Sequence, residues 1–149
     1  MKHLDVSAIK DGSVIDHIDS KSTLKVADIL NIRNEEQVVL VGMNLTSKLL
    51  GKKGIIKIGG KIIDQKEANK IALIAPNATV NIIKDYEVVK KFKIAVPDVL
   101  EGIVKCFNPN CVSNDINVVP KFNVASKNPI KLQCHYCERF MGTQDIQLI

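Results

Sequence analysis

Four cysteines near the end of the chain constrain its fold more than any other feature. Cys106 and Cys111 are separated by four residues, Cys134 and Cys137 by two, and 22 residues lie between the two pairs. Each short loop lets two thiolates converge on one ion, and Asn and Pro inside the first pair favour a tight turn. Four thiolates form the tetrahedral shell that Zn²⁺ takes in structural sites. The spacing therefore predicts one structural Zn²⁺ per chain, held by Cys106, Cys111, Cys134 and Cys137.

Two other uses of the cysteines are less well supported. Disulfides need an oxidising compartment, whereas the first hundred residues contain no cysteine and the N-terminus has no apolar stretch typical of an export signal. A catalytic zinc keeps one position open to water, which four thiolates leave closed. His135, inside the second pair, is expected to face solvent. We therefore expect a cytoplasmic protein, and no apolar run is long enough to span a membrane.

Charge is unevenly distributed along the chain. Residues 1–97 carry 16 Lys and Arg against 11 Asp and Glu, whereas residues 98–149 carry 5 of each. The basic part is the better candidate for meeting an anion such as a phosphorylated ligand. A nucleic-acid binder would more often interleave its basic residues with aromatics, but this chain has no Trp and its aromatic content is 4%. The neutral cysteine-rich part favours a protein partner.

Residues 1–97 alternate between strand-like and helix-like stretches. The order indicates an α+β fold, a ferredoxin-like βαββαβ sandwich with an extra strand. A small β-rich, zinc-ribbon-like domain is expected over residues 98–149, after the break at Pro97 and Asp98. Asp64 and Glu67 have the spacing of a helix capping box. The expected strands are 14–18, 38–41 (buried on both faces), 55–58, 78–83 and 86–96, with helices starting at Ser20 or Ser22 and after Asp64, and a hairpin connection at 51–54.

A few polar residues stand out within these strands. Asp16 and His17 lie between isoleucines, Lys57 is embedded in an apolar strand, Asn81 interrupts another, and lysines at 90, 91 and 93 form a basic patch. Such alternation more often marks the solvent face of a half-covered sheet than a binding site. No P-loop, nucleophile motif or metal-binding carboxylate cluster is present. These residues by themselves therefore do not specify an active site.

Several stretches together resemble the regulatory chain of aspartate carbamoyltransferase. They are residues 12–18 (GSVIDHI), 51–53 (GKK), 56–58 (IKI), 75–81 (APNATVN) and 86–89 (YEVV), followed by the spacing of the four cysteines. The resemblance covers nearly the whole chain. Its most specific parts are VIDHI and APNATVN, which occur in order ahead of the cysteines.

The resemblance implies a non-catalytic chain that controls pyrimidine biosynthesis. Residues 1–97 would be an allosteric domain that binds nucleotide effectors, CTP and ATP in the best-known members, with UTP as a further candidate. Residues 98–149 would be the zinc domain that contacts the catalytic chain. Regulatory chains of this family form homodimers within a dodecamer that also contains the catalytic chains. No nucleic acid and no membrane is expected as a partner.

The resemblance also assigns contacts with the base and ribose. Ile9 would offer backbone groups to the exocyclic amine of the base, and Tyr86 would help from the opposite strand. Asp16 would accept hydrogen bonds from the ribose hydroxyls, because an ionised carboxylate only accepts. Lys57 would reach both the base and the ribose.

The triphosphate and the pocket lining complete the predicted nucleotide site. His17 and Lys91 would face the triphosphate, where cations form charge-assisted hydrogen bonds. The other predicted residues, which line the pocket or lie near it, are Val14, Lys53, Asn81, Ile83 and Val88.

Two departures from the family pattern bear on effector choice. Ser7 stands where the best-known members carry a glutamate, which affects discrimination between purines and pyrimidines. Lys90 replaces a small residue, and we expect it to add charge near the phosphates and to tighten triphosphate binding. The rival hypotheses are a zinc-ribbon nucleic-acid binder, which RNA binding at rising salt would reveal, and a small nucleotide-directed enzyme, which turnover of CTP or ATP would reveal.

Overall fold

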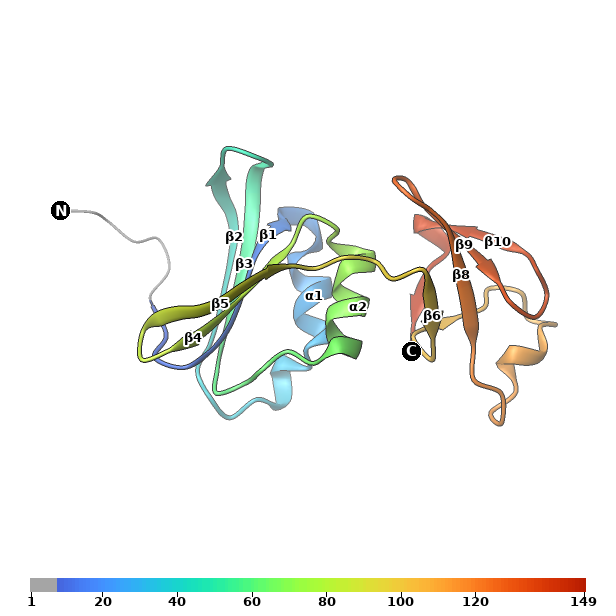
Figure 1. Cartoon of the computed structure of the whole chain (residues 1–149), viewed down its shortest axis with the longest axis horizontal. Coiled ribbons are helices and arrows are strands. Elements are labelled where there is room, and N and C mark those ends of the chain that lie inside the picture. The colour runs from blue at the N-terminus through green and yellow to red at the C-terminus, as the bar shows by residue number, and fades with distance from the viewer. Residues whose placement is uncertain (1–7) are drawn as a thin grey trace. The chain divides into compact units, whose positions relative to one another are not determined.

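The structure, a computed structural model, describes residues 8–149 (Figure 1). The chain separates into two units, Met1–Ala95 and Val96–Ile149, which are described in turn. Within the described residues, no helix combines the length and apolar character needed to span a bilayer.

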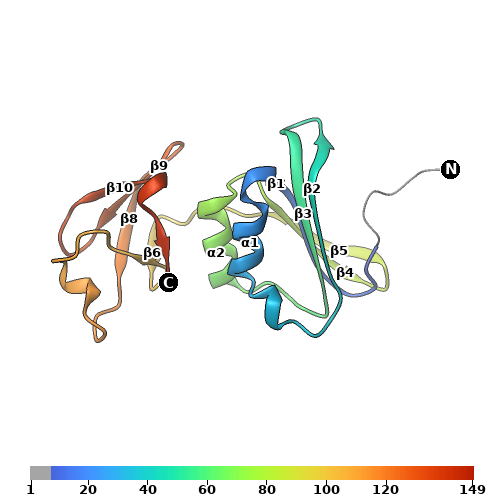
Figure 2. The same ribbon diagram turned by 180° about the vertical axis from the view of Figure 1, so that it is seen from behind.

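The first unit is a five-stranded antiparallel sheet with helices on one face. Helices α1 (Thr23–Ile29) and α2 (Gln65–Ile74) lie on the same side of the sheet in both views (Figures 1 and 2). No described helix covers the other side, which we call the open face. The strands are β1 (Gly12–Asp19), β2 (Val39–Ser47), β3 (Gly51–Gly59), β4 (Thr79–Lys84) and β5 (Glu87–Lys93), in the order β2-β3-β1-β4-β5. This confirms the ferredoxin-like βαββαβ arrangement, with β5 as the extra strand beside β4.

The core lies between the sheet and the two helices. Alternate residues of the central strands point toward the helices and are fully buried, as a half-covered sheet requires. Short 3₁₀ helices at Ser20–Ser22 and Ile32–Asn34 flank α1. The buried apolar residues include Ile15 and Ile18 of β1, Ile56 and Ile58 of β3, Val26 of α1 and Ile71 of α2.

The start of α2 is the predicted capping box. The Asp64 side chain accepts a hydrogen bond from the backbone N–H of Glu67 at 2.8 Å, and the Glu67 carboxylate accepts one from the backbone N–H of Asp64 at 3.4 Å. Lys61 also lies 2.9 Å from the Glu67 carboxylate. These contacts satisfy donors that a helix N-terminus otherwise leaves unpaired.

Three predicted details of the sheet are wrong. The 38–41 stretch was expected to be buried on both faces, but β2 is an edge strand in which Val41 is 39% exposed, and Val38 just before it is 63% exposed. Residues 51–54 belong to β3 rather than to a hairpin connection, because the β2–β3 hairpin extends to the pair Ser47–Gly51. The last strand is shorter than expected and ends at Lys93.

The second unit is a small β structure. A sheet with the order β10-β9-β8-β6 combines β6 (Val99–Glu101), β8 (Lys121–Lys127), β9 (Ile130–Cys134) and β10 (Phe140–Gly142). A second pairing joins β7 (Val104–Lys105) to β11 (Gln147–Leu148), and 3₁₀ turns lie at Val112–Asn114 and Thr143–Asp145. Besides cysteines, its buried apolar side chains are those of Val96, Leu100, Ile103, Val104, Phe122, Leu132 and Met141. This confirms the predicted β-rich, zinc-ribbon-like unit.

Candidate functional site

The four cysteines converge on one point in the second unit. All four Sγ atoms lie within 4.8 Å of one another. The Sγ atoms of Cys106 and Cys137 are 3.7 Å apart, and those of Cys111 and Cys134 are 3.6 Å apart. Zn–S bonds of about 2.3 Å at tetrahedral angles place sulfurs about 3.8 Å apart. The cluster therefore fits a tetrahedral ion with four thiolate ligands.

The first cysteine loop is held by its own backbone and amide groups. The Cys111 N–H donates to the Asn108 carbonyl at 3.0 Å, and the Asn114 side-chain amide donates to the same carbonyl at 2.7 Å. The Asn108 side chain in turn accepts from the Asn110 N–H at 3.1 Å. This turn brings Cys106 and Cys111 to the same side of the loop.

The second loop closes in a comparable way. The Glu138 N–H donates to the Cys134 carbonyl at 3.0 Å, and the Cys134 N–H donates to the Arg139 carbonyl at 3.0 Å. His135 lies in this loop with its ring against Tyr136 at a centroid distance of 5.1 Å, and it is exposed. Within residues 8–149, the metal-ligating group contains the cysteines without His135.

The thiols differ in how readily they ionise. Burial raises the pKa of Cys106 to about 12, because hydrogen bonding to Asn108 only partly offsets the desolvation. Burial also acts to raise the pKa of Cys137, but hydrogen bonds from Arg139 and Asn108 outweigh it and lower the pKa to about 7. Metal binding requires thiolates, so loading this site releases protons.

On the open face of the first unit, one row of paired residues crosses the sheet from edge to edge. Leu40 pairs with Lys57, Lys57 with Val14, Val14 with Asn81, and Asn81 with Lys91. Paired residues of antiparallel strands point to the same face. The neighbours of Lys57 in β3 are fully buried, so this row faces away from the helices. With strands about 4.8 Å apart, the backbones at Lys57 and Lys91 are separated by about 14 Å.

A polar cluster lies beside this row, where β1 bulges between Ile15 and Ile18. The Asp16 carboxylate is 2.9 Å from the Lys53 ammonium and accepts a hydrogen bond from the His17 N–H at 2.6 Å. His17 has a left-handed backbone with φ of 57°, and its Nδ1 is 3.0 Å from the Thr79 hydroxyl. The bulge therefore lets the successive residues Asp16 and His17 both join the cluster with Lys53 and Thr79.

Burial and charge act in opposite directions on Lys57. Desolvation lowers the pKa of this lysine, and the nearby Asp16 carboxylate partly restores it. On the open face, Lys53, Lys57, Lys91 and Lys93 outnumber the carboxylates of Asp16 and Asp19, since Lys93 pairs with Thr79 and Asp19 with Lys53. An excess of cations over a partly buried surface favours an anionic ligand.

Asn81, between Val14 and Lys91 in the row, has an unsatisfied acceptor. Its side-chain oxygen is buried, and no donor within residues 8–149 reaches it. A buried acceptor without a partner destabilises a fold by roughly 1–3 kcal/mol. The atom therefore suits a hydrogen bond from a bound ligand.

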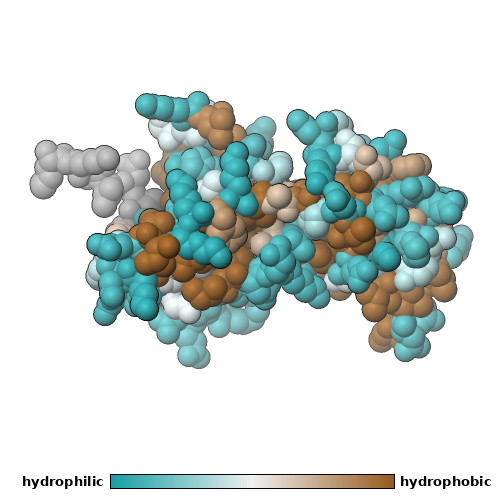
Figure 3. Space-filling view, viewed as in Figure 1, coloured by the Kyte–Doolittle hydropathy of each residue, from teal (hydrophilic) through white to brown (hydrophobic). Residues whose placement is uncertain are grey.

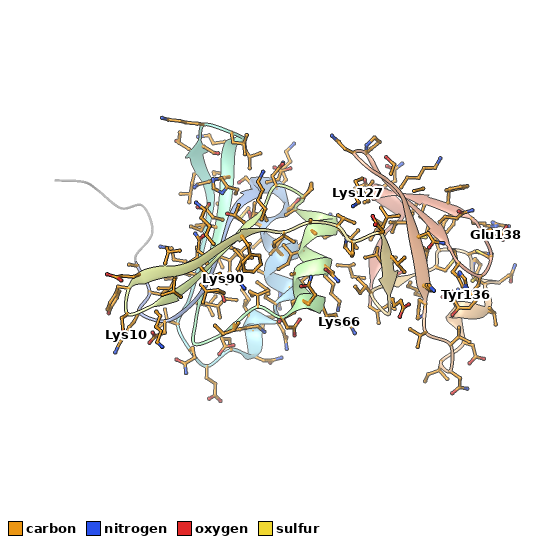
Figure 4. The ribbon with its side chains drawn as sticks, viewed as in Figure 1. Lys10, Lys66, Lys90, Lys127, Tyr136 and Glu138 are labelled. Atoms are coloured by element: carbon orange, nitrogen blue, oxygen red, sulfur yellow. The ribbon has the colours of Figure 1, made fainter. Side chains whose placement is uncertain are left out.

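A pocket of about 550 Å³ opens at one end of the sheet. Ile9 and Tyr86 both line it, and the Tyr86 N–H donates to the Lys10 carbonyl at 2.9 Å. In Figure 4, Lys10 lies by the turn between β4 and β5. The other lining residues come from the segment before β1, the segment before β2 and the end of β3: Ala8, Lys10, Asp11, Gln37, Val38, Gly59 and Gly60.

Ile83 and Val88, two further residues of the predicted nucleotide site, border this end of the sheet. Gly12 pairs with both Gly59 and Ile83, and Ile83 pairs with Val88. Figure 3 shows apolar side chains over β4 and β5, where Val88 is 55% exposed. The predicted nucleotide residues are thus distributed over the end pocket, this apolar border, the row of paired residues and the polar cluster.

Lys90 and Lys91 take opposite faces of β5. Lys90 pairs with Ile82, and Ile82 pairs with Ser13, which is fully buried on the helix side. The Lys90 ammonium lies 5.3 Å from the ring centroid of Phe92, two residues away on the same side. Lys90 therefore lies on the helix side of the sheet, and Lys91 on the open face. Ser7 lies outside the described residues.

The sequence alone did not single out every residue of this surface. Thr79 and Leu40 join the rows only through strand register, and Gln37 enters the end pocket from a loop. The alternation of polar and apolar residues in β4 could have indicated Thr79. No sequence signal marks Gln37.

Comparison with known proteins places the whole chain in one family. The allosteric domain of the aspartate carbamoyltransferase regulatory chain matches residues 4–95, and the metal-binding domain of the same chain matches residues 98–147. Similar proteins include the aspartate carbamoyltransferase regulatory chains of Pyrococcus abyssi (54% identity) and Pyrococcus horikoshii (55%), each over 98% of this chain and 97% of the relative. That of Thermococcus sibiricus is 58% identical over 95% of this chain and 93% of the relative. The chain belongs to the family of aspartate carbamoyltransferase regulatory chains, which are non-catalytic subunits of an enzyme of pyrimidine biosynthesis.

Proposed function

We propose that the first unit binds a nucleoside triphosphate effector on its open face and the adjoining end pocket. The observation that carries this proposal is the register of the sheet, which aligns Lys57, Val14, Asn81 and Lys91 on four neighbouring strands. Residues far apart in the sequence thereby form one cationic surface with an apolar centre. CTP and ATP, with UTP as a further candidate, are the proposed ligands.

The base occupies the end pocket in this arrangement. Backbone groups of Ile9 pair with the exocyclic amine, and Tyr86 contacts the base from the β4–β5 turn. Ile83 and Val88 supply apolar contacts beside it. A pocket of about 550 Å³ is within the usual range for small-molecule sites and exceeds the needs of a base alone.

The ribose and the triphosphate extend over the row through Lys57 and Lys91 and over the polar cluster at the β1 bulge. Asp16 accepts from the ribose hydroxyls while Lys53 holds the carboxylate at 2.9 Å, and Lys57 contacts both base and ribose. His17 and Lys91 face the phosphates. Charge-assisted hydrogen bonds of this kind are roughly twice as strong as neutral ones.

The second unit is proposed to bind one Zn²⁺ through Cys106, Cys111, Cys134 and Cys137. The ion supplies no catalytic step, because its four ligands are all protein thiolates. It fixes the two cysteine loops, which a unit with so small a core needs. Metal-bound thiolates fit a reducing compartment, here the cytoplasm.

The zinc unit is proposed to dock onto the catalytic chain. Between the two cysteine pairs, apolar side chains face solvent instead of the core: Val112 is 58% exposed, Ile116 97% and Val119 60%. Exposed apolar side chains gathered in one loop region are typical of protein interfaces. The regulatory chains are proposed to form homodimers in a dodecamer with the catalytic chains.

Control of the catalytic chain then follows from differential binding. A nucleotide that binds one quaternary state better than another shifts the population toward that state, with typical couplings of about 1–3 kcal/mol. Which nucleotide inhibits and which activates depends on that difference in affinity.

Adjacent lysines on opposite faces of β5 test the proposed site. Lys91→Ala removes a cation from the open face and is expected to weaken CTP binding roughly tenfold. Lys90→Ala removes the same charge from the other face and is the matched control, with CTP affinity nearly unchanged. The measurement is calorimetric titration of the zinc-loaded full chain, alone and assembled with the catalytic chain.

Each outcome of this titration is decisive. One competitive site per chain for CTP and ATP, sensitive to Lys91 alone, supports the proposal. Equal losses in the two variants would mean that general charge, and not this surface, attracts the nucleotide. Absence of binding by the wild type in both forms would overturn the proposal.

A further inference from the structure

Gln37 enters the end pocket because of two glycines at the end of β3. The Gly59 N–H donates to the Val38 carbonyl at 2.8 Å, which fixes the segment before β2 against β3. Gly60 follows with a left-handed φ of 72°. A Cβ at Gly60 would lie 3.3 Å from Cγ and 3.4 Å from Cδ of Gln37. The Gln37 side chain therefore lies across the bare backbone of Gly60.

This arrangement places a carboxamide on the pocket wall. Gln37 is exposed, and it lines the same pocket as Ile9 and Tyr86, which come from two other segments of the chain. Its backbone N–H donates to the Glu35 carboxylate at 3.3 Å. Gln37 and Gly60 both line this pocket of about 550 Å³, which is large enough for a ligand.

We propose that Gln37 is a base-recognition residue of the nucleotide site. A carboxamide presents an acceptor beside a donor, which matches an exocyclic amine beside a ring nitrogen acceptor. Glutamine pairs with the amino edge of adenine in this way in nucleic-acid complexes. Cytosine presents the same pattern on its N4 and N3 edge. The inference rests on the proposed function, since it assumes that a base occupies the end pocket.

The test separates recognition of the base from attraction of the phosphates. The full-length zinc-loaded chain is titrated with three ligands. They are CTP, the CTP analogue that lacks the 4-amino group, and inorganic tripolyphosphate. Gln37→Ala is compared with Gln65→Ala, the same substitution at an exposed position of α2. Thermal unfolding of both variants checks that the fold is retained.

The loss of a pair of hydrogen bonds predicts a specific pattern. Gln37→Ala should weaken CTP binding roughly fivefold to tenfold, leave tripolyphosphate binding unchanged and reduce the penalty for removing the 4-amino group. Gln65→Ala should change none of the three.

The inference and the proposed function fail in different ways. If the wild type binds CTP but Gln37→Ala keeps the full affinity and the full 4-amino penalty, the role of Gln37 is wrong and the site stands. Equal weakening of CTP and tripolyphosphate would also overturn base recognition. If the wild type binds no nucleotide, the proposed function fails and this inference with it.

Discussion

At the scale of single residues, the proposed contact of Lys57 with a nucleotide would link binding to protonation. Burial lowers the pKa of its ammonium from the ordinary value of 10.5, so the charged form destabilises the free fold at neutral pH. That destabilisation disappears as pH rises above 10.5, where the group is neutral in both folded and unfolded chains. A bound anion would favour the charged form and raise the pKa again.

Proton uptake on nucleotide binding is therefore expected at alkaline pH. At a pH just below the ordinary lysine value, CTP binding should take up a fraction of a proton, and affinity should fall as pH rises through the lowered pKa of Lys57. Calorimetry in buffers of different ionisation enthalpy measures the uptake. Lys57→Arg, which stays protonated, is the control and should abolish it. The same uptake in the variant would contradict the assignment to Lys57.

Residue type predicts part of the proposed nucleotide surface, but the register between strands decides the rest. Lys57 and Asn81 stand out in the sequence because each interrupts an apolar strand, and both lie on the open face. Lys90 and Lys91 look equivalent in the sequence. Strand alternation puts them on opposite faces, and the partners Asn81 and Ile82 show that Lys91 takes the open face and Lys90 the helix side.

At the scale of elements, the approach of α1 to β3 depends on a missing side chain. A Cβ at Gly54 would overlap the side chain of Thr23, the first residue of α1. Thr23 is fully buried, and its hydroxyl donates to the Ser20 carbonyl at 2.9 Å. Neither the threonine nor the strand can move away without breaking a pairing.

Gly54→Ala is expected to lower the free energy of unfolding by about 1–3 kcal/mol, as overpacking of a filled core does. The double variant with Thr23→Ala should recover part of that loss, because the shorter side chain leaves room for the new methyl group. Urea unfolding of the wild type, both single variants and the double variant measures the coupling. Strictly additive losses would show that helix and strand do not meet at this point.

The helices and strands of the first unit show how far sequence patterns predict its elements. The capping box at Asp64 was predictable because its two hydrogen bonds are local in the sequence. The edge position of β2 was not, because a continuous run of β-branched residues looks the same in an edge strand and a central one. The length of β3 was missed because its glycines and lysines are typical of turns, while the hairpin pairing that extends the strand depends on β2.

At the scale of the whole molecule, the two units rely on different sources of stability. The first contains an apolar core between sheet and helices, whereas the second combines a smaller set of buried apolar side chains with the cysteine cluster. Structural zinc contributes an apparent 10–16 kcal/mol in small zinc domains, roughly the whole stability of an ordinary domain. Metal removal should therefore unfold the second unit and spare the first.

Chelation of the metal provides the corresponding test. Removing Zn²⁺ should abolish association with the catalytic chain, because the exposed apolar loop residues lose their fixed positions, while CTP binding by the first unit persists. Hydrogen exchange should show lost protection in residues 96–149 and retained protection in β1, β3 and α2, and Zn²⁺ added back should restore both protection and assembly. A complex that survives complete chelation would show that the docking surface does not depend on the cysteine cluster. Loss of CTP binding together with the metal would show that the two units fold as one, since effector recognition would then require the zinc unit to be intact.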